Sequence, residues 1–115
     1  MSDCIFCKII AGQMESQVVY QDELVIAIED VNPQLPVHVL VIPREHYDHI
    51  GDQVPEAVLG RLFTVAAKVA EIKGVAQAGY RVITNIGEDG RQTVKHLHLH
   101  VLGGAKMPIH MGPAD

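Results

Sequence analysis

Short apolar runs alternate with polar turns along most of the chain, and each run predicts a β-strand. Runs rich in Val and Ile predict strands over residues 18–20, 24–28 and 37–42. The third run is almost wholly apolar, which is typical of a buried central strand, and it contains one histidine, His38. The Asn32-Pro33 pair predicts the turn that precedes this strand.

A change to helical spacing follows Pro55. Apolar residues recur at intervals of three and four over residues 58–72, which predicts one long amphipathic helix. Pro55 suits its first turn, and Gly74 is placed to end it. Two further strands are predicted at residues 80–84 and 94–102. Strands, one long helix and further strands indicate an α+β fold whose sheet is covered on one face.

Composition and charge narrow the class of protein. The 115 residues suffice for one domain, and 48% of them are hydrophobic, as expected of a folded chain. Fourteen acidic residues against nine basic ones give a net charge of −5, which disfavours a nucleic-acid polymer as partner. Backbone amides and histidines could still hold a small phosphorylated ligand. We find no signal-like or membrane-spanning apolar run, and therefore expect a cytoplasmic protein without a membrane partner.

Three histidines occupy alternate positions in the last predicted strand. Successive side chains of a strand point to opposite faces, so His96, His98 and His100 should share one face. The apolar residues between them should pack in the core behind. Histidine can be a nucleophile, an acid, a base or a metal ligand near pH 7. The pattern alone therefore leaves a metal site and a phosphate-handling site both open.

The only two cysteines, Cys4 and Cys7, form a Cys-x-x-Cys pair. In a reducing compartment this spacing indicates half of a metal site or a redox pair before a structural disulfide. Two small buried apolar side chains are the simpler alternative.

These motifs together resemble the histidine triad (HIT) superfamily. Residues 96–102 match its signature His-φ-His-φ-His-φ-φ, where φ is apolar. Residues 4–10, 30–38, 41–43 and 103–104 resemble the Hint branch, in its bacterial type with an N-terminal Cys-x-x-Cys. The resemblance covers essentially the whole chain, which would be one HIT domain, residues 1–115. It implies a HIT-like fold with an antiparallel sheet of about five strands, one long helix packed on it, and a two-fold homodimer with a continuous sheet.

The resemblance also implies an activity and its residues. Hint proteins hydrolyse purine nucleoside phosphoramidates and related conjugates through a nucleotidyl-histidine intermediate. His98 matches the nucleophile, His100 the residue beside the phosphate, and His38 a histidine that supports the triad begun by His96. A satisfied core histidine is the alternative for His38. The matching nucleotide contacts are Asp30 for the ribose, Ile28, Val31 and Leu40 for the base, Asn85 for ribose or phosphate, and Gln92 and Thr93 for the phosphate, through backbone amides and a hydroxyl. A plain core role is the alternative for Ile28 and Leu40.

A structural zinc ion is implied by the same resemblance. The matching ligands are Cys4, Cys7, His46 and His96, with His49 as a substitute for His46. Some Hint members lack the cysteines, so the architecture itself does not depend on zinc. No organic cofactor is expected.

Two features depart from the Hint pattern. Gly-Arg-Gln-Thr at residues 90–93 stands where Gly-Gly-Gln-Ser is usual, and residues 107–115 lack the usual Trp-Pro-Pro-Gly ending in a chain without tryptophan. The second departure leaves selectivity for the leaving group open. Two other functions also remain open: hydrolysis of dinucleoside polyphosphates, and a nucleotide- or zinc-binding interaction protein with little turnover.

Overall fold

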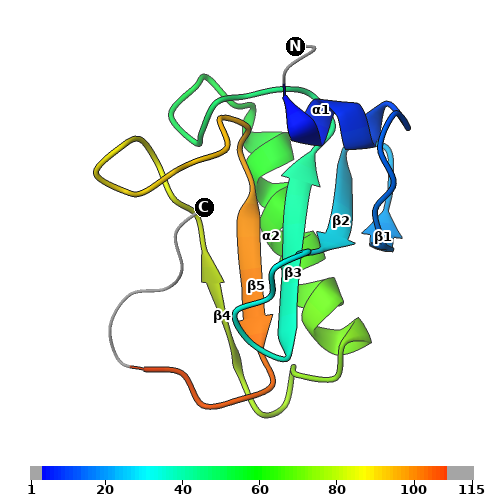
Figure 1. Cartoon of the computed structure of the whole chain (residues 1–115), viewed down its shortest axis with the longest axis vertical. Coiled ribbons are helices and arrows are strands. Elements are labelled where there is room, and N and C mark those ends of the chain that lie inside the picture. The colour runs from blue at the N-terminus through cyan, green and yellow to red at the C-terminus, as the bar shows by residue number, and fades with distance from the viewer. Residues whose placement is uncertain (1–3, 109–115) are drawn as a thin grey trace.

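The computed structural model describes residues 4–108 of the chain. These residues form one antiparallel sheet with helices packed on it. Its strands are β1 (Val18–Gln21), β2 (Val25–Glu29), β3 (Val37–Pro43), β4 (Tyr80–Ile83) and β5 (Leu99–Gly103). The strand order is β1-β2-β3-β5-β4, so β3 and β5, far apart in sequence, lie side by side in the centre (Figure 1). The α+β fold predicted from the sequence is confirmed.

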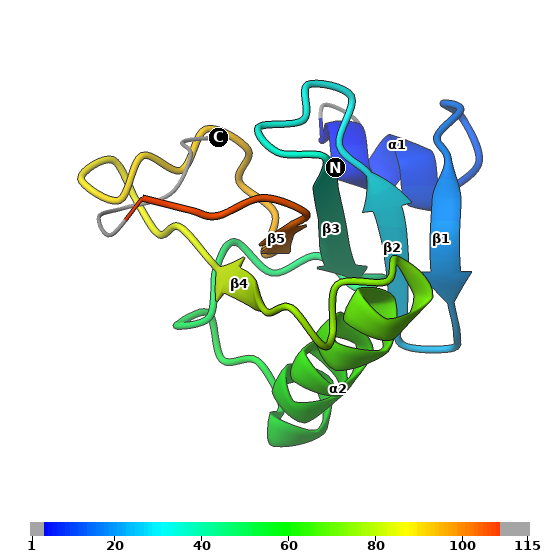
Figure 2. The same cartoon turned by 90° about the horizontal axis from the view of Figure 1, so that it is seen from below.

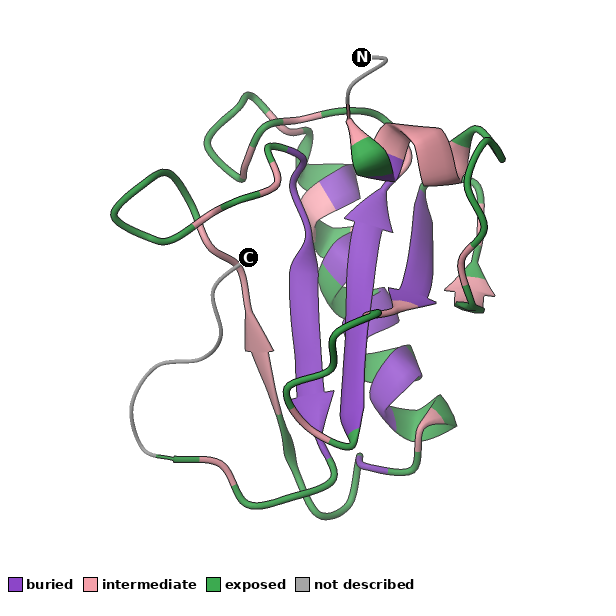
Figure 3. Cartoon of the chain, viewed as in Figure 1, coloured by how far each residue is buried: buried purple, intermediate pink, exposed green. Residues whose placement is uncertain are grey.

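The long helix α2 (Glu56–Ile72) packs on one face of the sheet, as predicted. It begins directly after Pro55, and Gly74 follows its end with a φ of +76°, a conformation that glycine adopts without strain. Its inner face buries Val58, Leu62, Val65, Ala66, Val69 and Ala70. These side chains pack against every second residue of the central strands, which makes the main core. Figure 3 shows the central strands β3 and β5 as buried along their whole length.

A short helix, α1 (Ile5–Ile10), lies on the opposite face of the sheet (Figure 2). It was not predicted, because its apolar stretch is only six residues long. Phe6 is buried there against a second apolar cluster formed by Ile26, Ile28, Leu40 and Ile42. The expectation of a sheet covered on one face is therefore wrong near β2 and β3, where both faces are covered.

The last strand begins five residues later than the predicted start at residue 94. The backbone N–H of Leu97 donates to the carbonyl of Tyr47 at 2.6 Å, outside the sheet ladder. His96 and His98 therefore precede β5, and only His100 lies within it. The predicted alternation nevertheless holds, since Leu97 and Leu99 pack in the α2 core.

None of the helices within residues 4–108 combines the length and the apolar character needed to cross a membrane. Most of the atypical carboxy-terminal segment, residues 109–115, lies outside the described residues.

Candidate active site

Four histidines gather on the sheet face opposite α2. His38, His96, His98 and His100 are each at most 2% exposed. The rings of His98 and His100 lie 5.1 Å apart between centroids, and those of His38 and His100 the same distance. Histidine is seldom fully buried unless its ring nitrogens have partners, and these partners identify the tautomers.

His98 has its proton on Nδ1. This nitrogen lies 2.6 Å from the carbonyl oxygen of His96, and a carbonyl can only accept a hydrogen bond. The lone pair is therefore on Nε2, the form that an attacking imidazole needs. The hydroxyl of Thr84 donates to the carbonyl of His98 at 2.8 Å and helps to hold its backbone.

His100 has the opposite tautomer. The backbone N–H of Gln34 donates to Nδ1 of His38 at 3.0 Å, so His38 carries its proton on Nε2. That Nε2 lies 2.8 Å from Nδ1 of His100 and 3.3 Å from a carboxylate oxygen of Asp30. His100 accepts at Nδ1 and so carries its own proton on Nε2. The site thus pairs a basic nitrogen on His98 with a proton donor on His100.

A cavity of about 280 Å³ opens beside His38. Its lining includes Asp30 and the apolar side chains of Ile28, Val31 and Leu40, and the structure thus brings together the residues predicted to contact the ribose and the base. Its size is near the lower end for small-molecule sites, which are mostly apolar with a few polar groups. Three further lining residues, Ile5, Phe6 and Ile9, come from α1 and were missed. Their i, i+1, i+4 spacing is the signal that could have found them.

Gln92 stabilises the loop before β5 through hydrogen bonds. Its backbone N–H donates to the carbonyl of Gly87, and its side-chain amide donates to the carbonyls of Asp48 (2.7 Å) and Val94 (3.0 Å). These N–H groups are therefore engaged within the protein. Asn85 directly follows Thr84, the residue that binds the backbone of His98.

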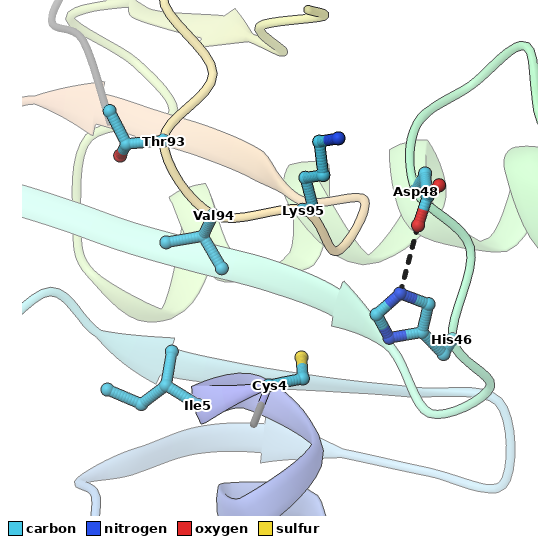
Figure 4. Close-up of a pocket in the computed structure, with 7 residues that line it drawn as sticks. All are labelled: Cys4, Ile5, His46, Asp48, Thr93, Val94 and Lys95. Carbon is cyan, nitrogen blue, oxygen red and sulfur yellow. Dashed lines mark hydrogen bonds and ion pairs between the residues drawn. The ribbon is translucent and has the colours of Figure 1, made fainter. Parts of the chain in front are cut away.

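A second hollow of about 390 Å³ adjoins the first, and Ile5 and Val94 line both. Thr93, Lys95, His46 and Asp48 line its remainder together with Cys4 (Figure 4).

Cys4, Cys7, His46 and His96 form a cluster that could hold a metal ion. One ligand atom of each lies within 4.8 Å of the others. Nδ1 of His96 is 3.3 Å from the Cys4 sulfur, and Nδ1 of His46 is 3.3 Å from the Cys7 sulfur. His49 lies outside this cluster, since its Nδ1 accepts from the backbone of Gly51.

The tautomers of both cluster histidines suit metal binding. Nε2 of His96 donates to the carbonyl of Pro43 at 3.0 Å, and Nε2 of His46 donates to Asp48 at 3.1 Å. Both Nδ1 lone pairs therefore face the sulfurs, and outer partners of this kind orient metal-bound histidines. Burial lowers the pKa of His96 to about 4, which keeps the ring neutral. Burial and the neighbouring Cys4 raise the pKa of the Cys7 thiol, and a bound cation favours the thiolate.

A second group, Asp30, His38 and His100, has similar spacing but different chemistry. The N–H of Gln34 occupies the Nδ1 lone pair of His38, so the Nε2 that faces the group carries a proton. This group is therefore a hydrogen-bonded chain that orients His100 rather than a metal site.

An antiparallel sheet with four buried histidines beside an apolar cavity defines a candidate active site for a small molecule. Comparison with known proteins gives the family. The HIT domain family matches residues 11–107. The chain is 47% identical over 104 residues to a purine nucleoside phosphoramidase of Escherichia coli, covering 89% of this chain and 87% of the relative. Protein HitA of Neisseria gonorrhoeae is 37% identical over 105 residues, covering 90% and 97%.

Solved structures agree with this result. A HIT family hydrolase from Clostridium thermocellum superposes with a TM-score of 0.91 at 46% identity, covering 96% of this chain and 98% of that one. A histidine triad protein from Clostridium difficile gives a TM-score of 0.91 at 45% identity over the same shares. This chain belongs to the HIT domain family.

Proposed function

We propose that this chain hydrolyses purine nucleoside 5′-phosphoramidates, with His98 as the nucleophile. That it is a hydrolase follows from its family and from relatives named as hydrolases and as a phosphoramidase. The main support for His98 as the nucleophile is that His98 and His100 have opposite tautomers. His98 has a lone pair on Nε2, whereas His100 has a proton there.

The reaction proceeds in two displacements at the α-phosphorus. Nε2 of His98 forms a bond to phosphorus while the P–N bond breaks, and His100 donates its Nε2 proton to the departing nitrogen. The negative charge left on the His100 ring is stabilised by the hydrogen bond that His38 donates to its Nδ1. Water then attacks the nucleotidyl-histidine, and the proton lost by water returns to His100. Nucleotide monophosphate and amine leave, and both histidines recover their starting forms.

The cavity beside His38 takes the nucleoside in this proposal. Ile28, Leu40 and the exposed Val31 contact the purine, and the Asp30 carboxylate accepts hydrogen bonds from the ribose hydroxyls. Asn85 and Thr93 contact the ribose or phosphate. Gln92 contributes by fixing the shape of the loop that precedes the nucleophile.

The metal centre holds zinc in this proposal. Two thiolates and two neutral imidazoles are a tetrahedral donor set that zinc favours, and they leave no ligand position for water. Cys4, Cys7, His46 and His96 would hold the ion, which stabilises the structure.

Two molecules form a homodimer in this proposal. Within residues 4–108, β4 pairs with β5 on one side only, so its other edge can extend the sheet into a second copy. We further expect the chain to act as one HIT domain in the cytoplasm, where reduced thiols are available for the metal.

Turnover of adenosine 5′-phosphoramidate tests the activity. Release of AMP and ammonia by the wild-type protein, at a rate well above that on a dinucleoside polyphosphate, supports the proposal. Preference for the polyphosphate would assign a different substrate class. Nucleotide binding without turnover would make the chain a binding protein instead.

A further inference from the structure

We infer that the metal centre positions the nucleophile, through His96 and Phe6. The inference rests on the proposed function, in which His98 attacks phosphorus. It makes His96 and Phe6 positioning residues, because each contacts the ring of His98 and is also tied to the metal-binding cluster.

The backbone at His98 lies outside the regular sheet. β5 begins at Leu99, and the backbone N–H groups of His96 and Leu97 donate to loop carbonyls, those of Val94 and Tyr47. The orientation of the His98 ring therefore depends on side-chain and loop contacts more than the orientation of a side chain within a strand does.

The first contact runs through His96. Its carbonyl accepts the Nδ1 proton of His98 at 2.6 Å, which sets the attacking tautomer. Its ring is held at both ends, at Nε2 by Pro43 and at Nδ1 by the cysteine sulfurs. A metal ion bound at Nδ1 would lock this ring, and with it the neighbouring peptide that carries the carbonyl.

The second contact runs through Phe6, which lies between Cys4 and Cys7 on α1. Its ring is 5.0 Å from that of His98 at an interplanar angle of 77°, an edge-to-face arrangement, and 5.8 Å from that of His96. Metal ligation by both cysteines would fix this first turn of α1 and the Phe6 ring against the nucleophile. Both contacts therefore depend on one cluster.

The substitution His46→Ala weakens the cluster without touching His98. His46 is the most exposed ligand of the four, and its ring contacts Cys7 and His96. His49→Ala is the matched control, because His49 lies on the same loop outside the cluster. The proteins are labelled with ¹⁵N-histidine, and the ring nitrogens of His98 are followed by NMR with Zn²⁺ bound and after chelation.

With Zn²⁺ bound, wild type and His49→Ala should both show His98 protonated at Nδ1. After chelation, or in His46→Ala, the His98 signals should shift toward a mixture of tautomers. We expect kcat to fall by about 10- to 100-fold, because a nucleophile held less precisely attacks more slowly, with little change in KM. Unchanged His98 signals and kcat in folded, zinc-free protein would overturn the inference.

Phe6→Leu provides a test in which the zinc ligands stay intact, should zinc removal unfold the chain. Leucine retains apolar burial but removes the aromatic edge, so the His98 signals should shift and kcat should fall at full zinc content. An unchanged spectrum and kcat would count against the inference. The NMR readout needs no substrate, so failure of wild type to turn over a phosphoramidate would reject the proposed function separately.

Discussion

At the scale of the residue, hydrogen-bond partners give identical side chains different chemistry. His98 donates to a carbonyl at Nδ1, whereas His100 accepts at the same atom from His38. Strand alternation predicts that these histidines share a face, and the structure confirms it. The tautomers could not be predicted from the pattern, because they depend on backbone groups of Gln34 and His96 that only the folded chain brings into contact.

Asp30 offers a prediction at this scale. In Asp30→Asn, the amide keeps an oxygen for the backbone N–H of Asn32 but loses the charge that strengthens hydrogen bonds to ribose. We expect KM to rise by about tenfold with a riboside substrate, with kcat little changed. The control is the 2′,3′-dideoxy substrate, for which wild type and variant should have similar KM values. An equal rise in KM on both substrates would show that Asp30 does not bind the ribose hydroxyls.

At the scale of the element, the sequence predicts the long helix and all five strands, but it misses α1 and misplaces the start of β5. The apolar period predicts α2 and β3 well, since each has enough residues to show it. α1 has six residues, too few to show a helical period, and the alternation before β5 continues over residues 94–98, which precede the strand. Both missed features lie at the site, which is why Ile5, Phe6 and Ile9 were absent from the expected pocket.

The junction of β1, β2 and α2 carries a prediction about stability. Burial opposes ionisation of Asp22, but hydrogen bonds from the backbone N–H groups of Leu24 and Val25, from Arg61 of α2 and from Tyr20 outweigh it and lower its pKa to about 2. A carboxyl group whose pKa is lower in the folded than in the unfolded state stabilises the folded protein at pH values above its unfolded-state pKa. The benefit should therefore be lost as the pH falls from about 4 to about 2.

Asp22→Asn measures this contribution. At pH 7 the variant should lose about 2 kcal/mol in the free energy of unfolding, since 1.4 kcal/mol corresponds to one pKa unit. The difference from wild type should disappear near pH 2. Asp89→Asn, in an exposed loop, is the control. Urea unfolding at several pH values provides the measurement, and a difference that persists unchanged at low pH would contradict the assignment.

At the scale of the whole molecule, the central strands bring distant parts of the sequence to one site. β3 supplies His38 and β5 supplies His100, while α1 closes the cavity from the amino-terminal end. The sequence predicts the five-stranded sheet and its long helix through the family resemblance, and the superposition on solved HIT structures confirms this part of the architecture.

The outer edge of β4, which no strand covers within residues 4–108, leads to a prediction about assembly. Sedimentation should give twice the chain mass of 12.6 kDa, as expected for a sheet that continues into a second copy. Tyr80→Lys places a charge on this edge strand and should shift the protein toward monomer. Ile50→Lys, on an exposed loop, is the control. A wild-type monomer at micromolar concentration would argue against the dimer.

Mass spectrometry of the covalent intermediate tests the central claim most directly. The protein is mixed with a slowly hydrolysed adenosine phosphoramidate, quenched, and its peptides are mapped. We predict one AMP group on His98, and no such adduct in His98→Ala. An adduct on His96, His100 or another residue, or one that persists in His98→Ala, would contradict the assignment of the nucleophile.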